Sequence, residues 1–172
     1  MKPHYATGVI TGRSVQRRQR QTLPRDYPML IIREPESSKE WKNYYRLRWE
    51  ILRAPLNLDK GSEKDDLEDF ATHRAIFENE KIIGVGRLHF IDKDKAQIRY
   101  MAVLEEYRGK GLGRMIVEEF AQISEQNKIF KIILYARDSV IEFYKKLGFE
   151  IIKKAHRLGN IQHFLMERNN NY

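Results

Sequence analysis

The feature that most constrains this chain is a glycine-rich turn that follows an apolar strand and opens a helix. The segment Arg108-Gly109-Lys110-Gly111-Leu112-Gly113 comes directly after the run 96–104. Apolar residues then recur at helical spacing to about residue 127. Glycines let backbone NH groups converge, and a helix start adds partial positive charge. Together with Arg114, the turn therefore predicts a site for phosphate groups.

Two common phosphate-binding motifs do not match the spacing of this turn. A Walker loop ends in Gly-Lys-Ser/Thr, whereas this turn ends in Gly113-Arg114-Met115. A dinucleotide-binding Gly-x-Gly-x-x-Gly opens a βαβ unit, whereas these glycines alternate after an expected antiparallel meander. Both classes are disfavoured. A glycine-rich turn whose basic residues are simply solvated remains the alternative without a function.

The remaining pattern predicts one mixed α/β domain. Strands are expected at 29–33, 73–77, 81–90, 96–104, 130–136, 149–155 and 161–167, and helices at 39–53, 112–127 and from about 138 to 147. Ser37 and Glu40 have capping-box spacing for the first helix. Asp138 or Ser139 is expected to cap the third helix, and Gly148 to end it.

The turn resembles the Arg/Gln-x-x-Gly-x-Gly/Ala pyrophosphate loop of the GNAT superfamily, the acetyl-CoA-dependent N-acyltransferases. The segment 143–149 (Phe-Tyr-Lys-Lys-Leu-Gly-Phe) resembles that family's second signature, and 98–103 resembles its coenzyme-pairing strand. The resemblance covers about residues 29–167 and extends to small uncharacterised bacterial acetyltransferases. It implies a central, mostly antiparallel sheet with flanking helices and a splayed parallel pair of strands at the coenzyme site.

The same resemblance implies which residues bind acetyl-CoA. The backbone of the turn and the Arg108 side chain would hold the pyrophosphate, and the strand around Met101 would pair with the pantetheine arm and stabilise an oxyanion. The implied coenzyme residues are Met101, Ala102, Val103, Arg108, Gly109, Lys110, Gly111, Leu112, Gly113 and Arg114. Arg137 stands where many family members carry an Asn.

Tyr144 matches the family's general acid, which would protonate the departing CoA thiolate. The alternative is a core aromatic residue on an apolar helix face. The base is predicted among histidines on strands, with His89 as the first candidate and His163 as a second candidate or substrate contact. Hydrogen-bonded or surface histidines are the alternative. No metal is expected, because the chain has no Cys and no tight His spacing.

The acceptor site is predicted from charged side chains. Arg87 and Arg99 on neighbouring strands are candidates for binding a carboxylate or phosphate of the acceptor, unless they pair with acids of the protein. The acidic stretch 59–69 would attract a cationic amine such as a polyamine, an aminoglycoside or a lysine side chain. Otherwise it is a solvated helix face.

The charge distribution argues against a basic surface on the domain. The first 25 residues carry six basic residues and no acid, out of a net charge of +8. We therefore divide the chain into a basic extension (1–28), a catalytic domain (29–168) and a polar tail (169–172). Three roles are considered for the extension: local docking on the domain, an organellar transit peptide, and contact with nucleic acid. We do not expect the chain to bind nucleic acid.

The expected function is direct transfer of an acetyl group from acetyl-CoA to an amine, without a covalent enzyme intermediate. The alternatives are a non-catalytic CoA-binding module and nucleic-acid binding through the extension. No apolar run is long enough to cross a bilayer. We expect a cytoplasmic protein without membrane contact, for which a homodimer stays open.

Overall fold

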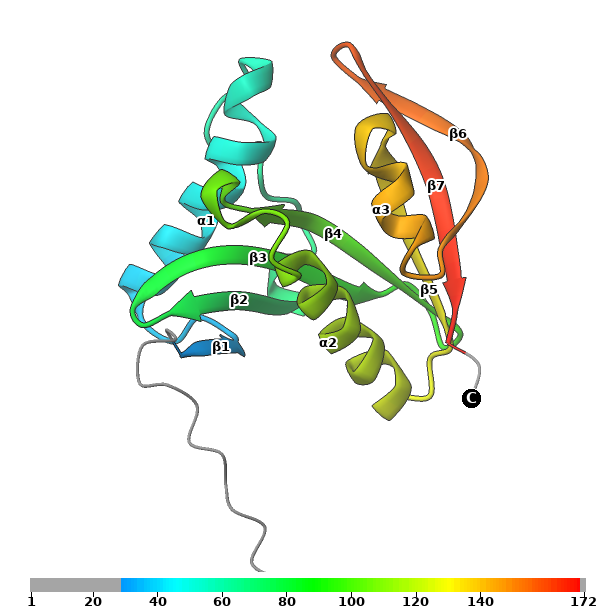
Figure 1. The fold of residues 1–172 in the computed structure, drawn as a ribbon, viewed down its shortest axis with the longest axis horizontal. Coiled ribbons are helices and arrows are strands. Elements are labelled where there is room, and N and C mark those ends of the chain that lie inside the picture. The colour runs from blue at the N-terminus through cyan, green and yellow to red at the C-terminus, as the bar shows by residue number, and fades with distance from the viewer. Residues whose placement is uncertain (1–28, 171–172) are drawn as a thin grey trace, which may run out of the picture.

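A computed structural model describes residues 29–170, so the predicted extension 1–28 and residues 171–172 of the predicted tail lie outside the described residues. The strands are β1 (Leu30–Arg33), β2 (Thr72–Glu78), β3 (Lys81–Phe90), β4 (Lys95–Val103), β5 (Lys131–Arg137), β6 (Glu150–Leu158) and β7 (Ile161–Asn169). The helices are α1 (Ser38–Leu52), α2 (Leu112–Gln126) and α3 (Ile141–Lys145), and four short 3₁₀ turns lie at Ala54–Leu56, Glu68–Phe70, Glu105–Tyr107 and Asp138–Val140. Figure 1 shows their arrangement.

The strands form one seven-stranded sheet in the order β1-β2-β3-β4-β5-β7-β6. All neighbours in this sheet are antiparallel except β4 and β5, which are parallel. This confirms the predicted fold class, a mostly antiparallel sheet with flanking helices and one parallel pair. The predicted meander and the final hairpin are also confirmed.

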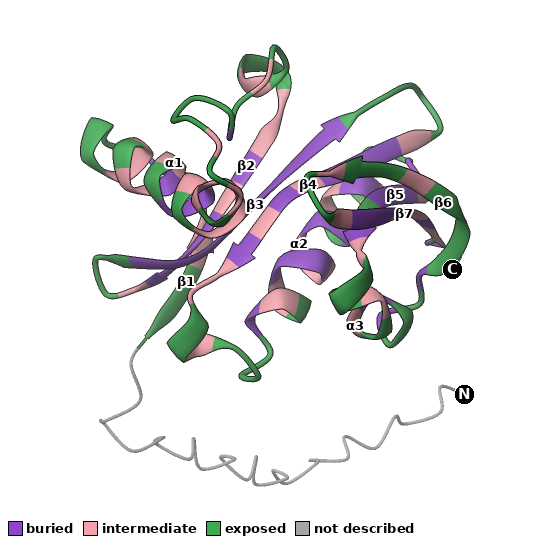
Figure 2. Cartoon of the chain, turned by 90° about the horizontal axis from the view of Figure 1, so that it is seen from above, coloured by how far each residue is buried: buried purple, intermediate pink, exposed green. Residues whose placement is uncertain are grey.

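The helices cover the two faces of the sheet because side chains alternate along each strand. Ala75 and Phe77 of β2 pack with Tyr44 and Leu47 of α1, whereas Ile76 between them packs in the core formed with α2 and α3. Figure 1 shows α1 and α2 on opposite sides of the strands, and Figure 2 shows the buried residues gathered in the strands between them.

The parallel pair opens after a short contact. β4 and β5 are in register only from Lys95 with Lys131 to Gln97 with Ile133. Further along, β4 bulges, because Tyr100 and Met101 together oppose Gly86 of β3. Tyr100 has φ 53°, a left-handed conformation that is uncommon for a non-glycine residue. The bulge bends β4 away from β5 and creates the predicted splay.

Glycine at position 86 lets α2 approach the sheet at this bulge. A Cβ at Gly86 would lie 2.7 Å from Ile116 Cγ2 and 2.9 Å from a ring carbon of Phe120. Both side chains belong to α2, so the sheet and the helix that opens at the glycine-rich turn are held in close contact.

Helix caps follow the predictions at α1 but not at α3. Glu40 N donates to Ser37 Oγ at 3.2 Å, and Ser37 N donates to a Glu40 carboxylate oxygen at 3.4 Å, which confirms the capping box. The prediction that Asp138 or Ser139 caps the third helix was wrong. Residues Asp138–Val140 form a 3₁₀ turn instead, and α3 begins at Ile141 without a side-chain cap.

The C-terminal boundary lies later than predicted. β7 runs to Asn169, and Asn170 is buried, with its backbone NH donating to Phe130 O at 2.6 Å. These two residues pack with the domain, because they extend the pairing of β7 with β5. Across residues 29–170, no helix is long and apolar enough to cross a membrane.

Candidate functional site

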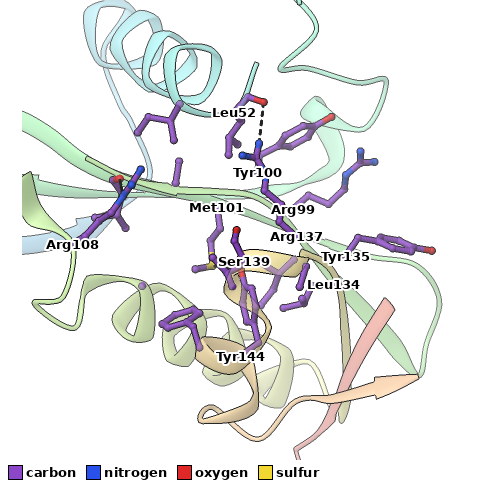
Figure 3. A pocket seen from close by; sticks show the side chains of 18 of the residues that line it. Leu52, Arg99, Tyr100, Met101, Arg108, Leu134, Tyr135, Arg137, Ser139 and Tyr144 are labelled. Carbon is purple, nitrogen blue, oxygen red and sulfur yellow. Dashed lines mark hydrogen bonds between the residues drawn. The ribbon is translucent and has the colours of Figure 1, made fainter. Parts of the chain in front are cut away.

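The splay between β4 and β5 forms the wall of a pocket of about 700 Å³, a volume typical of ligand sites. The pocket is lined by β4 from residue 98 to 103, the glycine-rich turn, β5 from residue 134 to 137, α3 and the end of α1. Because β4 has no register partner in β5 beyond Gln97, its backbone beside the pocket is available to a ligand. Figure 3 shows the lining side chains.

The glycine-rich turn forms one end of this pocket. Gly109 and Gly111 have φ of 73° and 81°, and a Cβ at either would meet nothing within 4 Å. Gly111 is the N-cap of α2, where no side chain caps the helix and no acid lies in the first turn. The first NH groups of a 15-residue helix are therefore open to an anion.

Gly113 serves packing rather than turn geometry. A Cβ at this position would lie 2.8 Å from Phe143 Cζ, so glycine lets α2 and α3 meet. The two segments with family signatures are thus in direct contact. Of the ten predicted coenzyme residues, nine line the pocket. The exception is Lys110, which is exposed and has its ammonium 4.9 Å from the centroid of the Tyr107 ring.

Tyr144 belongs to the second of these segments, lies on α3 and lines the pocket. Its side chain is 8% exposed, and its hydroxyl donates to Met101 Sδ at 3.8 Å. Burial raises the pKa of Tyr144, so the phenol stays protonated at neutral pH. A sulfur atom is a weak acceptor, so this proton is held by only a weak bond. The pocket thus has a protonated hydroxyl in contact with Met101 of the open strand.

The acidic stretch does not face the pocket as a free acidic surface. Glu68 bridges the two fully buried guanidinium groups of Arg48 and Arg87, at 2.8 and 2.7 Å. Asp65 contacts Arg87 and also Arg99, the latter at 3.1 Å. The predicted attraction of a cationic acceptor is therefore wrong for these two acids, because arginines of the sheet and of α1 already neutralise them.

Arg87 and Arg99 differ in position although they are register partners on β3 and β4. Arg87 is 0% exposed and is absent from the pocket lining, so the structure does not place it where an acceptor could reach it. Arg87 instead pairs with acids of the protein, Asp65 and Glu68, which was the stated alternative. Arg99 lines the pocket, and its side chain is 40% exposed despite the contact with Asp65.

The histidines separate in the same way. His89 on β3 is buried and does not line the pocket, so the structure gives the first candidate base no access to the site. His73 is also outside the lining, hydrogen-bonded to Tyr44 Oη and Glu68 O. His163 on β7 does line it, with its ring stacked at 4.7 Å on His156 of β6. Burial, then His156 and Arg137, lower the pKa of His163.

Three residues that line the pocket, His156, Arg53 and Arg137, are not among the predicted site residues. His156 and Arg53 carried no signal in the sequence, because they reach the pocket from β6 and from the end of α1. Arg137 differs from the Asn of the resembled family, and that difference was the one available signal. Among the residues that the structure describes, no Asp or Glu lines the pocket.

Figure 3 shows Arg108 on one side of Met101 and both Arg99 and Arg137 on the other. The cleft thus has the glycine-rich turn at one end, an unpaired strand and a phenol in the middle, and further cations at the opposite end. The pocket therefore runs along the unpaired part of β4 from the glycine-rich turn to this group of arginines.

Comparison with known proteins identifies the family. The model of the acetyltransferase (GNAT) family matches residues 36–149. The chain belongs to this family and is an acyltransferase, and members of the family use acetyl-CoA.

Individual relatives agree with this assignment. A Bacillus subtilis protein described as "Uncharacterized N-acetyltransferase YjcF" is 25% identical over 132 residues, which cover 76% of this chain and 94% of the relative. The fold is similar to that of Ard1 from Thermoplasma volcanium, with a TM-score of 0.72, 22% identity and coverage of 83% and 99%. It is also similar to an aminoglycoside 6'-N-acetyltransferase in complex with coenzyme A, with a TM-score of 0.71, 12% identity and coverage of 83% and 98%.

Proposed function

We propose that the chain transfers the acetyl group of acetyl-CoA directly to an amine, with Tyr144 as the general acid. The observation that carries the proposal is the position of this phenol. It is protonated, lies in the pocket and contacts Met101 on the splayed strand. A positioned acid beside an unpaired strand is what departure of a thiolate requires.

The residues of the turn fit the phosphate groups of the coenzyme. Open NH groups at the start of α2 would hold the pyrophosphate, together with the side chains of Arg108 and Arg114. Arg108 is exposed and its Nε donates to Val103 O at 3.3 Å, which keeps the guanidinium beside the strand. Acetyl-CoA itself supplies the activated acetyl group.

The middle of the pocket would orient the reaction. Backbone groups of β4 near Met101 face the opening without a strand partner in β5, so they can hold the pantetheine arm and stabilise charge on the thioester oxygen. Tyr144 would give its proton to the leaving sulfur. His163 is the candidate acceptor for the proton of the amine, because its lowered pKa keeps the imidazole neutral at neutral pH.

Replacing Tyr144 with Phe tests the acid role. Because the Met101 sulfur is the hydroxyl's only hydrogen-bond partner within residues 29–170, the variant should fold and bind acetyl-CoA nearly as the wild type does. Its kcat should fall about 100- to 10,000-fold, the range typical of a lost acid. Turnover is measured by thiol release across an amine panel, and affinity by the rise of the melting temperature with acetyl-CoA.

Tyr135→Phe is the matched control, because Tyr135 lines the same pocket and is exposed at its rim. It should keep wild-type turnover. Equal turnover of Tyr144→Phe and wild type would contradict the acid role, and unfolding of Tyr144→Phe would support a core aromatic instead. Binding of acetyl-CoA without thiol release for every amine would favour the CoA-binding module.

A further inference from the structure

The end of the pocket opposite the glycine-rich turn holds two guanidinium groups that converge on one oxygen. Arg53 follows α1 directly, and Arg137 is the last residue of β5. Arg53 Nη1 donates to Leu52 O at 3.2 Å, and Arg137 Nη2 donates to the same oxygen at 3.1 Å. Figure 3 shows the bond from Arg137 across the pocket to Leu52. Two half-buried cations are thus held side by side at the pocket wall.

Within residues 29–170, neither guanidinium contacts a carboxylate. The contrast with Arg48 and Arg87 is informative, since each of those buried groups is paired with Glu68. Backbone oxygens occupy Nε and Nη1 of Arg53 and Nη2 of Arg137. Because a guanidinium has five NH donors, both groups keep donors for a ligand.

The local charge is far from balanced. Leu52 is the last residue of α1, whose C-terminus carries about half a negative charge, whereas the two guanidinium groups carry two full positive charges. Burial, and then the charge of Arg53, lower the pKa of Arg137, so its charged form is less favoured here than in water. Arg99 adds a third cation to the lining, already shared with Asp65. An anion bound here would relieve this repulsion.

We propose that the acceptor is an amine that also carries an anionic group, a carboxylate or a phosphate, and that Arg53 and Arg137 bind this group. This inference rests on the proposed acetyl transfer, for which it names the substrate class. Arg99 lies beside the two groups and would contribute to the attraction. The same charges would disfavour purely cationic acceptors such as polyamines, because no acid of residues 29–170 lines the pocket to receive them.

The position of the two arginines also limits the size of the acceptor. The guanidinium carbon of Arg53 lies 5.4 Å from the centroid of the Tyr100 ring. Tyr100 precedes Met101, whose sulfur contacts the hydroxyl of Tyr144. All of these residues line the same pocket, so the anion site shares the cleft with the segment at which the acetyl group would be transferred. A small molecule with few bonds between amine and anion fits, such as an amino acid or an aminoalkyl phosphate.

The test compares matched acceptors that differ in the anion. Amino acids are assayed against their amides, and phosphoethanolamine against ethanolamine, by thiol release at saturating acetyl-CoA. The anionic member of a pair should have a kcat/KM about 10- to 100-fold higher, as expected for a charged hydrogen bond. The two arms distinguish a carboxylate from a phosphate. Equal or better use of the neutral members and of diamines would overturn the proposal.

Variants locate the anion. Arg137→Gln removes the charge together with the Nη2 bond to Leu52 O, and it should raise KM for the anionic acceptor and abolish the preference while the affinity for acetyl-CoA is unchanged. Arg53→Gln should act in the same direction. The reciprocal variant is Arg114→Gln, which should weaken acetyl-CoA binding and keep the preference between acceptors. A preference that survives in Arg137→Gln and Arg53→Gln would contradict the assignment.

A binding arm separates failure of this inference from failure of the proposed function. The protein loaded with coenzyme A is titrated calorimetrically with the same amino acids, amides, phosphoethanolamine and ethanolamine. Binding of an anionic amine that is lost in Arg137→Gln supports the anion site even if no acceptor is acetylated, in which case only the transferase proposal fails. Absence of any binding preference for the anionic members overturns the inference.

Discussion

Replacing Glu68 with Gln removes the carboxylate that joins α1 to the sheet. Glu68 accepts hydrogen bonds from Arg48 Nη1 and Nη2 at 2.9 and 2.8 Å and from Arg87 Nη1 at 2.7 Å. Both arginine side chains are fully buried, and the Glu68 side chain is 11% exposed. The substitution keeps the shape of the side chain but leaves Arg48 without a counter-charge.

The expected loss can be estimated from this arrangement. Removing one partner of a buried ion pair destabilises a protein by about 3–5 kcal/mol. Arg87 keeps Asp65 as a partner, and the Gln oxygen can still accept one bond, so we expect the lower end, about 3 kcal/mol. For a chain of this size, such a loss lowers the melting temperature by roughly 6–12 °C.

Equilibrium unfolding in urea near neutral pH, followed by circular dichroism, measures the difference. Glu119→Gln is the control, since Glu119 pairs with Arg74 at 2.7 Å but both side chains are partly exposed. The control should lose less than about 1 kcal/mol. A loss of less than about 1 kcal/mol in Glu68→Gln as well would refute the reasoning, because the buried arginines would then not depend on this carboxylate.

Three further predictions concern pH, packing and capping. Burial alone would raise the pKa of Glu68, but its bonds with Arg48 hold the pKa below the usual value. The contribution of Glu68 to the free energy of unfolding is therefore complete above the unfolded pKa of about 4.3 and is lost as the pH falls below that value. Urea titrations at decreasing pH should therefore show a shallower acid loss for Glu68→Gln than for wild type, and parallel curves would contradict this. Gly113→Ala should cost about 1–3 kcal/mol and weaken acetyl-CoA binding, because its Cβ would lie 2.8 Å from Phe143 Cζ, and a smaller residue at 143 should restore part of both in thermal melts. Ser37→Ala should cost about 0.5–2 kcal/mol through loss of the α1 cap, whereas no change in the unfolding midpoint would show that the cap contributes nothing.

Local patterns in the sequence were sufficient for most of the architecture. The strand order of the meander, the helix behind the glycine-rich turn and the capping box at Ser37 depend on neighbouring residues, so periodicity and spacing reveal them. The turn also predicts an anion site, because glycines and a helix start act through the backbone next to them. The resemblance of two short segments was enough to indicate the family that the comparison identified.

The third helix shows where local reading failed. Asp138 and Ser139 are good capping residue types, yet Asp138 Oδ1 accepts the NH of Ser139 in a 3₁₀ turn, and α3 begins later. The segment follows β5 into the pocket wall, and the packing of Phe143 on Gly113 decides where α3 lies. The preference of a residue type for a helix end stabilises a structure less than such a tertiary contact does.

The sequence alone determined that the chain has a glycine-rich turn before a helix, a mixed sheet and a tyrosine in a segment that resembles a family signature. Only the tertiary structure decided which charged residues face the pocket. Arg87 and Arg99 look equivalent in the sequence, but one is buried against Asp65 and Glu68 and the other lines the pocket. Arg53 and Arg137 are 84 positions apart in numbering, yet both bind Leu52 O. Partners of a charge depend on contacts between distant segments, and these arise only when α1, β4 and β5 pack together.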